Sequence, residues 1–143
     1  MATRNARTTW SGSVSEGSGE VRLASSGVGT FPVSFPKRAA DDADRTTSPE
    51  ELIAGALSSC YAMQFSALLG QAGGTPTELD ITAEVDFGPD PEGGFHIPGI
   101  RLAVKATVPE LSAEDVRRVA EEAKTTCPVS KALAAVPITL TVG

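Results

Sequence analysis

Hydrophobic and polar positions alternate with period two in the second half of the chain. Residues 79–87 and 95–108 each place apolar side chains at every second position, which predicts two half-buried strands. Residues 88–94 form the turn between them, and Pro98 with Gly99 predicts a kink or bulge in the second strand. We expect the two strands to pair antiparallel.

Shorter β-prone segments lie at both ends of the chain. Residues 8–14 and 19–25 are joined by a Gly/Ser/Glu turn and predict a hairpin. Residues 31–36 are apolar but contain two prolines, which favours an irregular or edge strand. Residues 138–142 predict a closing strand.

A long apolar segment lies in the middle of the chain and predicts a central helix from about residue 49 to a glycine pair at 73–74. Ser48 and Glu51 form a capping-box pattern, and Pro49 suits the first helical position. The helix lacks a polar stripe, so we expect protein to cover most of its surface. Its length would suffice to cross a bilayer, but serines and Gln64 interrupt the apolar run and no basic cluster flanks it, so we reject that interpretation.

Two further helices are predicted near the C-terminus. Ser112 caps an amphipathic helix to about Lys124, with its apolar face at Ala113, Val116, Val119, Ala120 and Ala123. A short helix begins at Pro128. The order of elements predicts one α+β domain, residues 1–143, in which a long central helix packs against antiparallel sheet. Burying the far side of that helix favours a homodimer with a two-fold interface.

Composition narrows the function. Twelve basic against eighteen acidic residues give a net charge of −6, without a basic cluster, so neither nucleic acid nor an anionic membrane is an expected partner. Residues 1–10 contain no apolar core of a secretory signal, so we expect a cytoplasmic protein. Two cysteines in that compartment are expected to be reduced at rest. His96 and the cysteines lack the close spacing of metal ligands, so no metal or other cofactor is expected.

The two cysteines have contrasting local environments. Cys127 precedes Pro128 and would occupy the N-cap of the short helix, where free N–H groups favour the thiolate. Cys60 lies within the apolar helix, where burial would raise its thiol pKa unless a cation compensates. Arg38 is the preferred cation, with Arg45 and Arg22 as alternatives, and Glu50 is the carboxylate available to hold it. Ten residues along a helix rise about 15 Å, so Glu50 would reach Cys60 only from a partner subunit.

The segment Ser48-Pro49-Glu50-Glu51-Leu52-Ile53, followed by Cys60 and by Cys127-Pro128-Val129-Ser130-Lys131-Ala132-Leu133, resembles the OsmC family of the OsmC/Ohr superfamily of thiol-dependent hydroperoxide reductases. The resemblance spans nearly the whole chain. It implies an intertwined homodimer with central helices enclosed by two sheets. Arg38 matches the family pattern less closely than the other site residues, because the run before it lacks the usual aromatic pattern and the following acidic loop is longer.

The same resemblance implies an organic hydroperoxide reductase with Cys60 as peroxidatic cysteine and Cys127 as resolving cysteine. Arg38 would activate Cys60, and Glu50 would orient Arg38. The expected reductant is a dithiol such as a lipoyl group on a protein. The alternative is a non-catalytic dimeric protein that binds a small apolar ligand in the same cavity.

Overall fold

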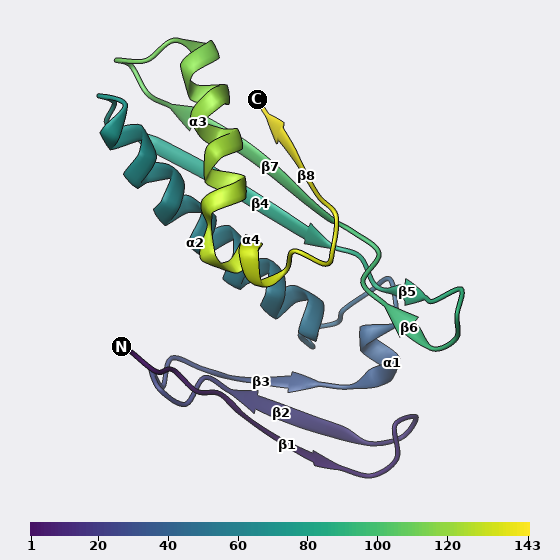
Figure 1. Ribbon diagram of the computed structural model, residues 1–143. Helices are drawn as coiled ribbons and strands as arrows, with labels where there is room; N and C mark the ends of the chain where they lie inside the picture. Colours follow the sequence, from purple (N-terminus) through teal and green to yellow (C-terminus); the bar gives the residue numbers. More distant parts are fainter. The chain divides into compact units, whose positions relative to one another are not determined.

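The computed structural model describes residues 1–143, and the chain forms two compact units, Met1–Leu52 and Ile53–Gly143. The boundary falls within the first turn of the long helix α2, Pro49–Gln71 (Figure 1). That one domain spans 1–143 stays a prediction.

The first unit contains a three-stranded antiparallel sheet in the order β1-β2-β3. Strands β1 (Arg7–Ser11) and β2 (Ser18–Arg22) form the predicted hairpin. Strand β3 (Thr30–Val33) lies at the edge, where Pro32 can be accommodated.

Helix α1 (Phe35–Arg38) follows β3, and the sequence prediction missed it. Ser34 is its N-cap, with the hydroxyl accepting the N–H of Lys37 at 3.3 Å, and Pro36 fits the first turn. The predicted irregular strand therefore ends at Val33, and the chain turns into a helix that carries Arg38 at its end. Thr47, just before α2, forms an isolated parallel bridge with Val33 at the end of β3.

The second unit is built on a sheet in the order β4-β7-β8. Strands β4 (Glu78–Val85) and β7 (Ile100–Thr107) pair antiparallel, as predicted, while β8 (Ile138–Val142) joins β7 in parallel. The predicted strand 95–108 is divided instead of kinked. Its first residues form strand β6 (Phe95–His96), which pairs with β5 (Gly88–Pro89) in a small hairpin. The ring of Phe87, just before β5, stacks on that of Phe95, with the ring centroids 5.1 Å apart.

Helix α3 (Ala113–Thr126) and the part of α2 in this unit cover one face of the sheet (Figure 1). Ser112 caps α3 as predicted, whereas Ala113 is exposed and was wrongly assigned to the core face. The core between helices and sheet is aliphatic with two aromatic rings. It includes Leu57, Tyr61, Phe65, Leu69, Ile100, Leu102, Val104, Val119 and Ala120.

One face of α2 is not covered by the rest of the second unit. Its buried residues recur every three or four positions and face the core, while the residues between them are small or flexible and exposed. Met63 is 73% exposed on that face. The helix is long and apolar enough to cross a bilayer by length and composition, a property that core helices of other proteins share. The exposed positions are Gly55, Ala56, Ser59, Met63, Ser66, Ala67 and Gly70.

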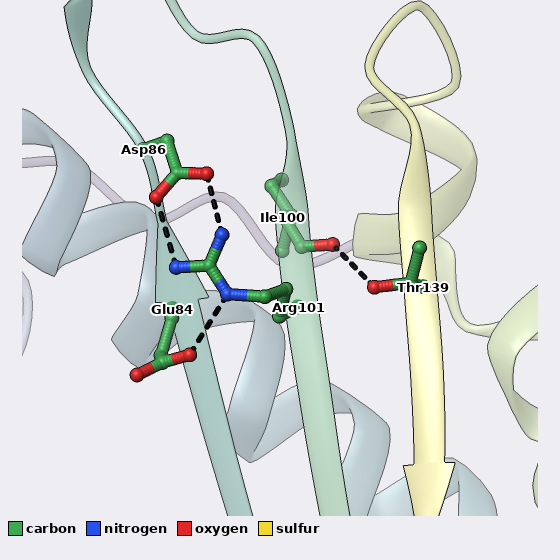
Figure 2. A network of polar contacts seen from close by, with 5 residues as sticks. All are labelled: Glu84, Asp86, Ile100, Arg101 and Thr139. Carbon is green, nitrogen blue, oxygen red and sulfur yellow. Dashed lines mark hydrogen bonds and ion pairs between the residues drawn. The ribbon is translucent and has the colours of Figure 1, made fainter.

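The opposite, solvent-facing side of the sheet carries a polar network (Figure 2). Arg101 on β7 donates to Glu84, its register partner on β4, at 3.0 Å and forms a two-pronged contact with Asp86. The hydroxyl of Thr139 on β8 donates to the carbonyl of Ile100 at 3.5 Å. These contacts connect all three strands away from the core.

Candidate functional site

The structure places the two cysteines together in the second unit. Cys60 lies in the middle of α2, and Cys127 lies between α3 and α4 (Pro128–Ala132), 67 residues further along the chain. Their sulfur atoms are 3.1 Å apart, with the Cys127 thiol donating to Cys60 Sγ. Both are free thiols. A small movement would bring these sulfurs to the bonding distance of a disulfide, about 2 Å.

The two thiols differ in exposure. Cys127 is fully buried, at 0% exposure, whereas Cys60 is partly exposed. A reagent from solvent therefore has access to Cys60 and not to Cys127.

The electrostatic surroundings of the two sulfurs also differ. Burial raises the pKa of Cys60, and the neighbouring Cys127 adds to that increase. No cation is among the groups that shift it. Burial opposes ionisation of Cys127 as well, but the neighbouring Cys60 thiol and the polar groups of Ser130 and Val129 outweigh it and lower the Cys127 pKa, although the Cys127 side chain makes no capping hydrogen bond. Both directions agree with the sequence prediction.

Helix α4 is the local cause of the Cys127 environment. Cys127 is its N-cap and Pro128 its first residue, as predicted. Pro128 has no N–H, and the Lys131 N–H bonds to the carbonyl of Cys127, so the Val129 and Ser130 N–H groups are the ones without a partner within the helix.

Two hydrogen bonds between helices α2 and α3 keep the cysteines opposite one another, and the sequence analysis missed both. The Tyr61 hydroxyl donates to the carbonyl of Ala120 at 2.8 Å in the core. Gln64 Nε2 donates to the Thr126 hydroxyl at 3.0 Å. Tyr61 follows Cys60 and Thr126 precedes Cys127, so a polar residue beside each cysteine was the available signal.

The first unit holds the predicted arginine and carboxylate as a pair. Arg38 Nη2 and Nε donate to Glu50 at 2.7 and 3.1 Å, and Glu50 is only 6% exposed. This two-pronged geometry fits a guanidinium and a carboxylate. Arg22 and Arg45 are both exposed, and the arginine that pairs with Glu50 is Arg38.

The capping box at the start of α2 is only half formed. Ser48 Oγ accepts the N–H of Glu51 at 3.1 Å, as predicted, but the Glu51 carboxylate accepts a bond from the Thr47 hydroxyl at 2.6 Å. Glu51 is thus occupied, which leaves Glu50 for Arg38.

An apolar cavity of about 430 Å³ lies beside Arg38 within the first unit. Its wall comes from the inner face of the small sheet, from α1 and from the first turn of α2. The lining includes Trp10, Val14, Val21, Phe35, Arg38 and Leu52.

The remaining candidates lie elsewhere. His96 is in the β5–β6 hairpin, with Nδ1 3.6 Å from the carboxylate of Asp90. No three side chains of His, Cys, Asp or Glu are grouped as metal ligands.

A mixed α and β fold with two adjacent free thiols on its central helix and its C-terminal helix pair defines a two-cysteine thiol protein. Residues 41–141 match the family described as OsmC-like protein, and the chain belongs to that family. It is 36% identical over 126 residues to peroxiredoxin OsmC of Escherichia coli K12, covering 88% of this chain and 86% of that protein.

More distant relatives agree. The chain is 33% identical over 92 residues to organic hydroperoxide resistance protein-like 1 of Staphylococcus saprophyticus, covering 64% of each protein. Its fold is similar to the crystal structure of the organic hydroperoxide resistance protein OhrB of Bacillus subtilis, with a TM-score of 0.76 and 26% identity over 97% of this chain and 98% of that one. The predicted family and α+β fold class are confirmed, whereas the intertwined homodimer stays a prediction.

Proposed function

We propose that this protein is a thiol-dependent peroxidase that reduces organic hydroperoxides to alcohols through a Cys60 sulfenic acid and a Cys60–Cys127 disulfide. The 3.1 Å separation of the two sulfur atoms carries the proposal. The names of its relatives, peroxiredoxin and organic hydroperoxide resistance protein, support a redox role that concerns hydroperoxides.

Cys60 is the attacking sulfur in this proposal because it is the accessible one. Its thiolate attacks the terminal oxygen of the hydroperoxide, the O–O bond breaks, and the alkoxide takes a proton and leaves as an alcohol. Cys127 then attacks the sulfenic sulfur of Cys60, which forms the disulfide and releases water. An external dithiol supplies the two electrons that restore both thiols.

Attack requires a Cys60 thiolate, which burial disfavours. The Arg38–Glu50 pair is suited to correct this, because guanidinium stays charged and the buried carboxylate fixes its orientation. Glu50 and Cys60 lie ten residues apart on α2, a rise of about 15 Å. We therefore assign the activating pair at each Cys60 to Arg38 and Glu50 of the partner subunit.

The exposed face of α2 supports the homodimer that this assignment needs. A helix with small side chains on a solvent-exposed face can approach a second copy closely, and the two-fold operation would bury the face on both chains. In this arrangement the apolar length of α2 serves protein packing, and we propose a soluble cytoplasmic enzyme without membrane or nucleic-acid partners.

The cavity beside Arg38 supports a substrate with a hydrocarbon tail. Its lining is mainly apolar, and burying a tail there gains about 25 cal/mol per Å² of apolar surface. The same cavity is what the alternative, an apolar ligand carrier without turnover, would use.

Turnover separates the two. Purified protein is mixed with cumene hydroperoxide and dithiothreitol, and peroxide loss is followed. We expect steady loss that disappears in Cys60→Ser and is slower in Cys127→Ser, in which dithiothreitol has to reduce the Cys60 sulfenic acid directly. No loss with the unaltered protein would contradict the peroxidase and favour the carrier.

A further inference from the structure

The two sulfurs of the site are unequal as targets for a reducing thiol. Cys60 is partly exposed and lies on the route that a hydroperoxide must use, whereas Cys127 is 0% exposed. A thiol from solvent can reach only the first of them. In thiol–disulfide exchange, the sulfur that is attacked and the sulfur that leaves are different atoms, so access to one fixes the role of the other.

The surroundings of Cys127 suit a departing thiolate. Cys127 is the N-cap of α4, where the N–H groups of the first turn are available to a negative charge. Those of Ser130 and Val129 lower the Cys127 pKa. A thiol of lower pKa leaves a disulfide faster.

Ser130 adds a side-chain donor at this point. It is the third residue of α4, the position from which a side chain reaches back to the N-cap. Its side chain is 6% exposed, and its oxygen has no conventional hydrogen-bond partner, although burying a hydroxyl alone is unfavourable. The same hydroxyl contributes to the lowered pKa of Cys127. A negative charge that forms on Cys127 only during turnover would explain why the Ser130 hydroxyl has no partner in the resting protein.

We propose that an external thiol reduces the oxidised protein by attacking Cys60, that Cys127 is the leaving group, and that Ser130 is a positioning residue for the departing thiolate. This inference rests on the disulfide of the proposed function and concerns the step that opens it.

The exchange balances as follows. The thiolate of a dithiol bonds to Cys60 Sγ, the Cys60–Cys127 bond breaks, and the electron pair stays on Cys127 Sγ. The second thiolate of the dithiol then attacks its own sulfur in the mixed disulfide, which forms a cyclic disulfide and releases the Cys60 thiolate. Two electrons pass from the dithiol to the cysteine pair.

A monothiol meets an obstacle at the second step. The Cys127 thiolate remains beside Cys60 and can attack it again, which expels the monothiol and restores the starting disulfide. That return is intramolecular, so it competes strongly with a second thiol from solution. A dithiol, the reductant class that the family resemblance implies, avoids this return because its own second sulfur also reacts intramolecularly.

Peptide mapping of a trapped intermediate tests the regiochemistry. The disulfide is made with diamide, so that the test is independent of peroxide turnover. N-acetylcysteine is added in large excess, which populates the mixed disulfide against its intramolecular return, followed by rapid acid quench, alkylation and mass spectrometry. We expect N-acetylcysteine on Cys60 and alkylation on Cys127. An adduct on Cys127, equal adducts on both, or failure of diamide to form the disulfide would overturn the proposal. Because diamide forms the disulfide, this mapping can be interpreted even if the protein shows no peroxidase activity.

Reduction kinetics test Ser130. The rate constant for reduction of the diamide-formed disulfide by dithiothreitol should fall about five- to tenfold in Ser130→Ala and recover in Ser130→Thr, because a hydrogen bond to a charged group is lost and regained. In a Cys60→Ser background, thiolate absorbance at 240 nm should show a higher Cys127 pKa when Ser130 is removed. Ser15→Ala, in an exposed turn, is the matched control and should change neither. An unchanged rate in folded Ser130→Ala would refute the Ser130 role. If that variant fails to fold, Ser130→Thr and Ser130→Val, which have the same shape and differ in the hydroxyl, are compared, and equal reduction rates would refute the role instead.

Discussion

The hydroxyl of Tyr61 donates to the main-chain carbonyl of Ala120 at 2.8 Å, and both residues are fully buried. This bond joins the helix that carries Cys60 to the helix that ends at Cys127. Tyr61 directly follows Cys60, and its ring also packs against that of Phe65, with the ring centroids 5.6 Å apart. The apposition of the two thiols thus depends on a specific contact between helices as well as on general apolar packing.

Tyr61→Phe should lower the free energy of unfolding by about 1 kcal/mol, the usual contribution of one hydrogen bond, because the ring packing is kept. Urea unfolding followed by circular dichroism measures the change. Tyr61→Ala, which also empties the ring's place in the core, should lower it by about 3–5 kcal/mol. Equal losses in the two variants would show that the hydroxyl, and not the ring, supplies the stabilisation.

Tyr61 also predicts behaviour at alkaline pH. Burial raises the pKa of this single tyrosine well above its ordinary value, with smaller contributions from Glu121 and Cys127. A raised pKa means that the native state favours the protonated phenol, so the stabilisation is complete below about pH 10 and is lost as pH rises toward the native value. Phenolate absorbance at 295 nm should therefore appear together with unfolding. Phenolate in the folded protein near pH 10 would contradict the burial of Tyr61.

Sequence patterns predicted the elements whose causes are local. The N-cap position of Cys127 follows from the proline after it, and the start of α2 follows from Ser48, Pro49 and Glu51. The strands at β4 and β7 follow from their period-two alternation. In each of these cases neighbouring residues determine the structure, so a short window of sequence contains the information.

Contacts between distant segments were less accessible. No pattern in the sequence specifies that Tyr61 meets Ala120. The pairing of Cys60 with Cys127 was expected from the family resemblance alone, because nothing in the local sequence brings together sulfurs that are 67 residues apart and lie 3.1 Å from one another. Helix α1 was missed because Pro32 and Pro36 both suggested irregular structure, although one fits an edge strand and the other a first helical turn. The pairing of Arg38 with Glu50 was expected from charge and chemistry, and the structure records it.

Arg38→Ala should slow the reaction of Cys60 with cumene hydroperoxide by about 100-fold or more, on the scale of one lost electrostatic donor. In stopped-flow measurements the thiolate absorbance of Cys60 at 240 nm should also move to higher pH. Arg45→Ala and Arg22→Ala are the matched controls and should react at nearly the normal rate. A normal rate in Arg38→Ala with a slow rate in one control would move the activating role to that other arginine.

Disrupting the exposed face of α2 should separate the proposed homodimer. Ala67→Glu places a charge among small residues on that face. Sedimentation equilibrium should give twice the 14.7 kDa chain mass for the unaltered protein and a lower mass for the variant. Thr141→Glu, on the exposed side of β8, is the control and should remain dimeric. A monomeric unaltered protein with full turnover would contradict the assignment of Arg38 and Glu50 to the partner subunit.

Arg101→Ala should destabilise the fold slightly without altering turnover. Hydrogen bonds from Arg101 lower the pKa of Asp86, so this stabilisation is present above the ordinary carboxyl pKa and disappears as pH falls below it. The network is exposed, so salt should screen it. The urea midpoints of the two proteins should differ at pH 7 in low salt and converge in concentrated salt. A difference that persists in concentrated salt would point to packing by the Arg101 side chain.

Intact mass after a single dose of cumene hydroperoxide tests the account most directly. With no reductant present, each chain should lose two hydrogens, and peptide mapping should show Cys60 bonded to Cys127. Oxygen added to Cys60 without that bond, or an unchanged mass after the peroxide has been offered, would contradict the claim that this pair of sulfurs reduces hydroperoxides.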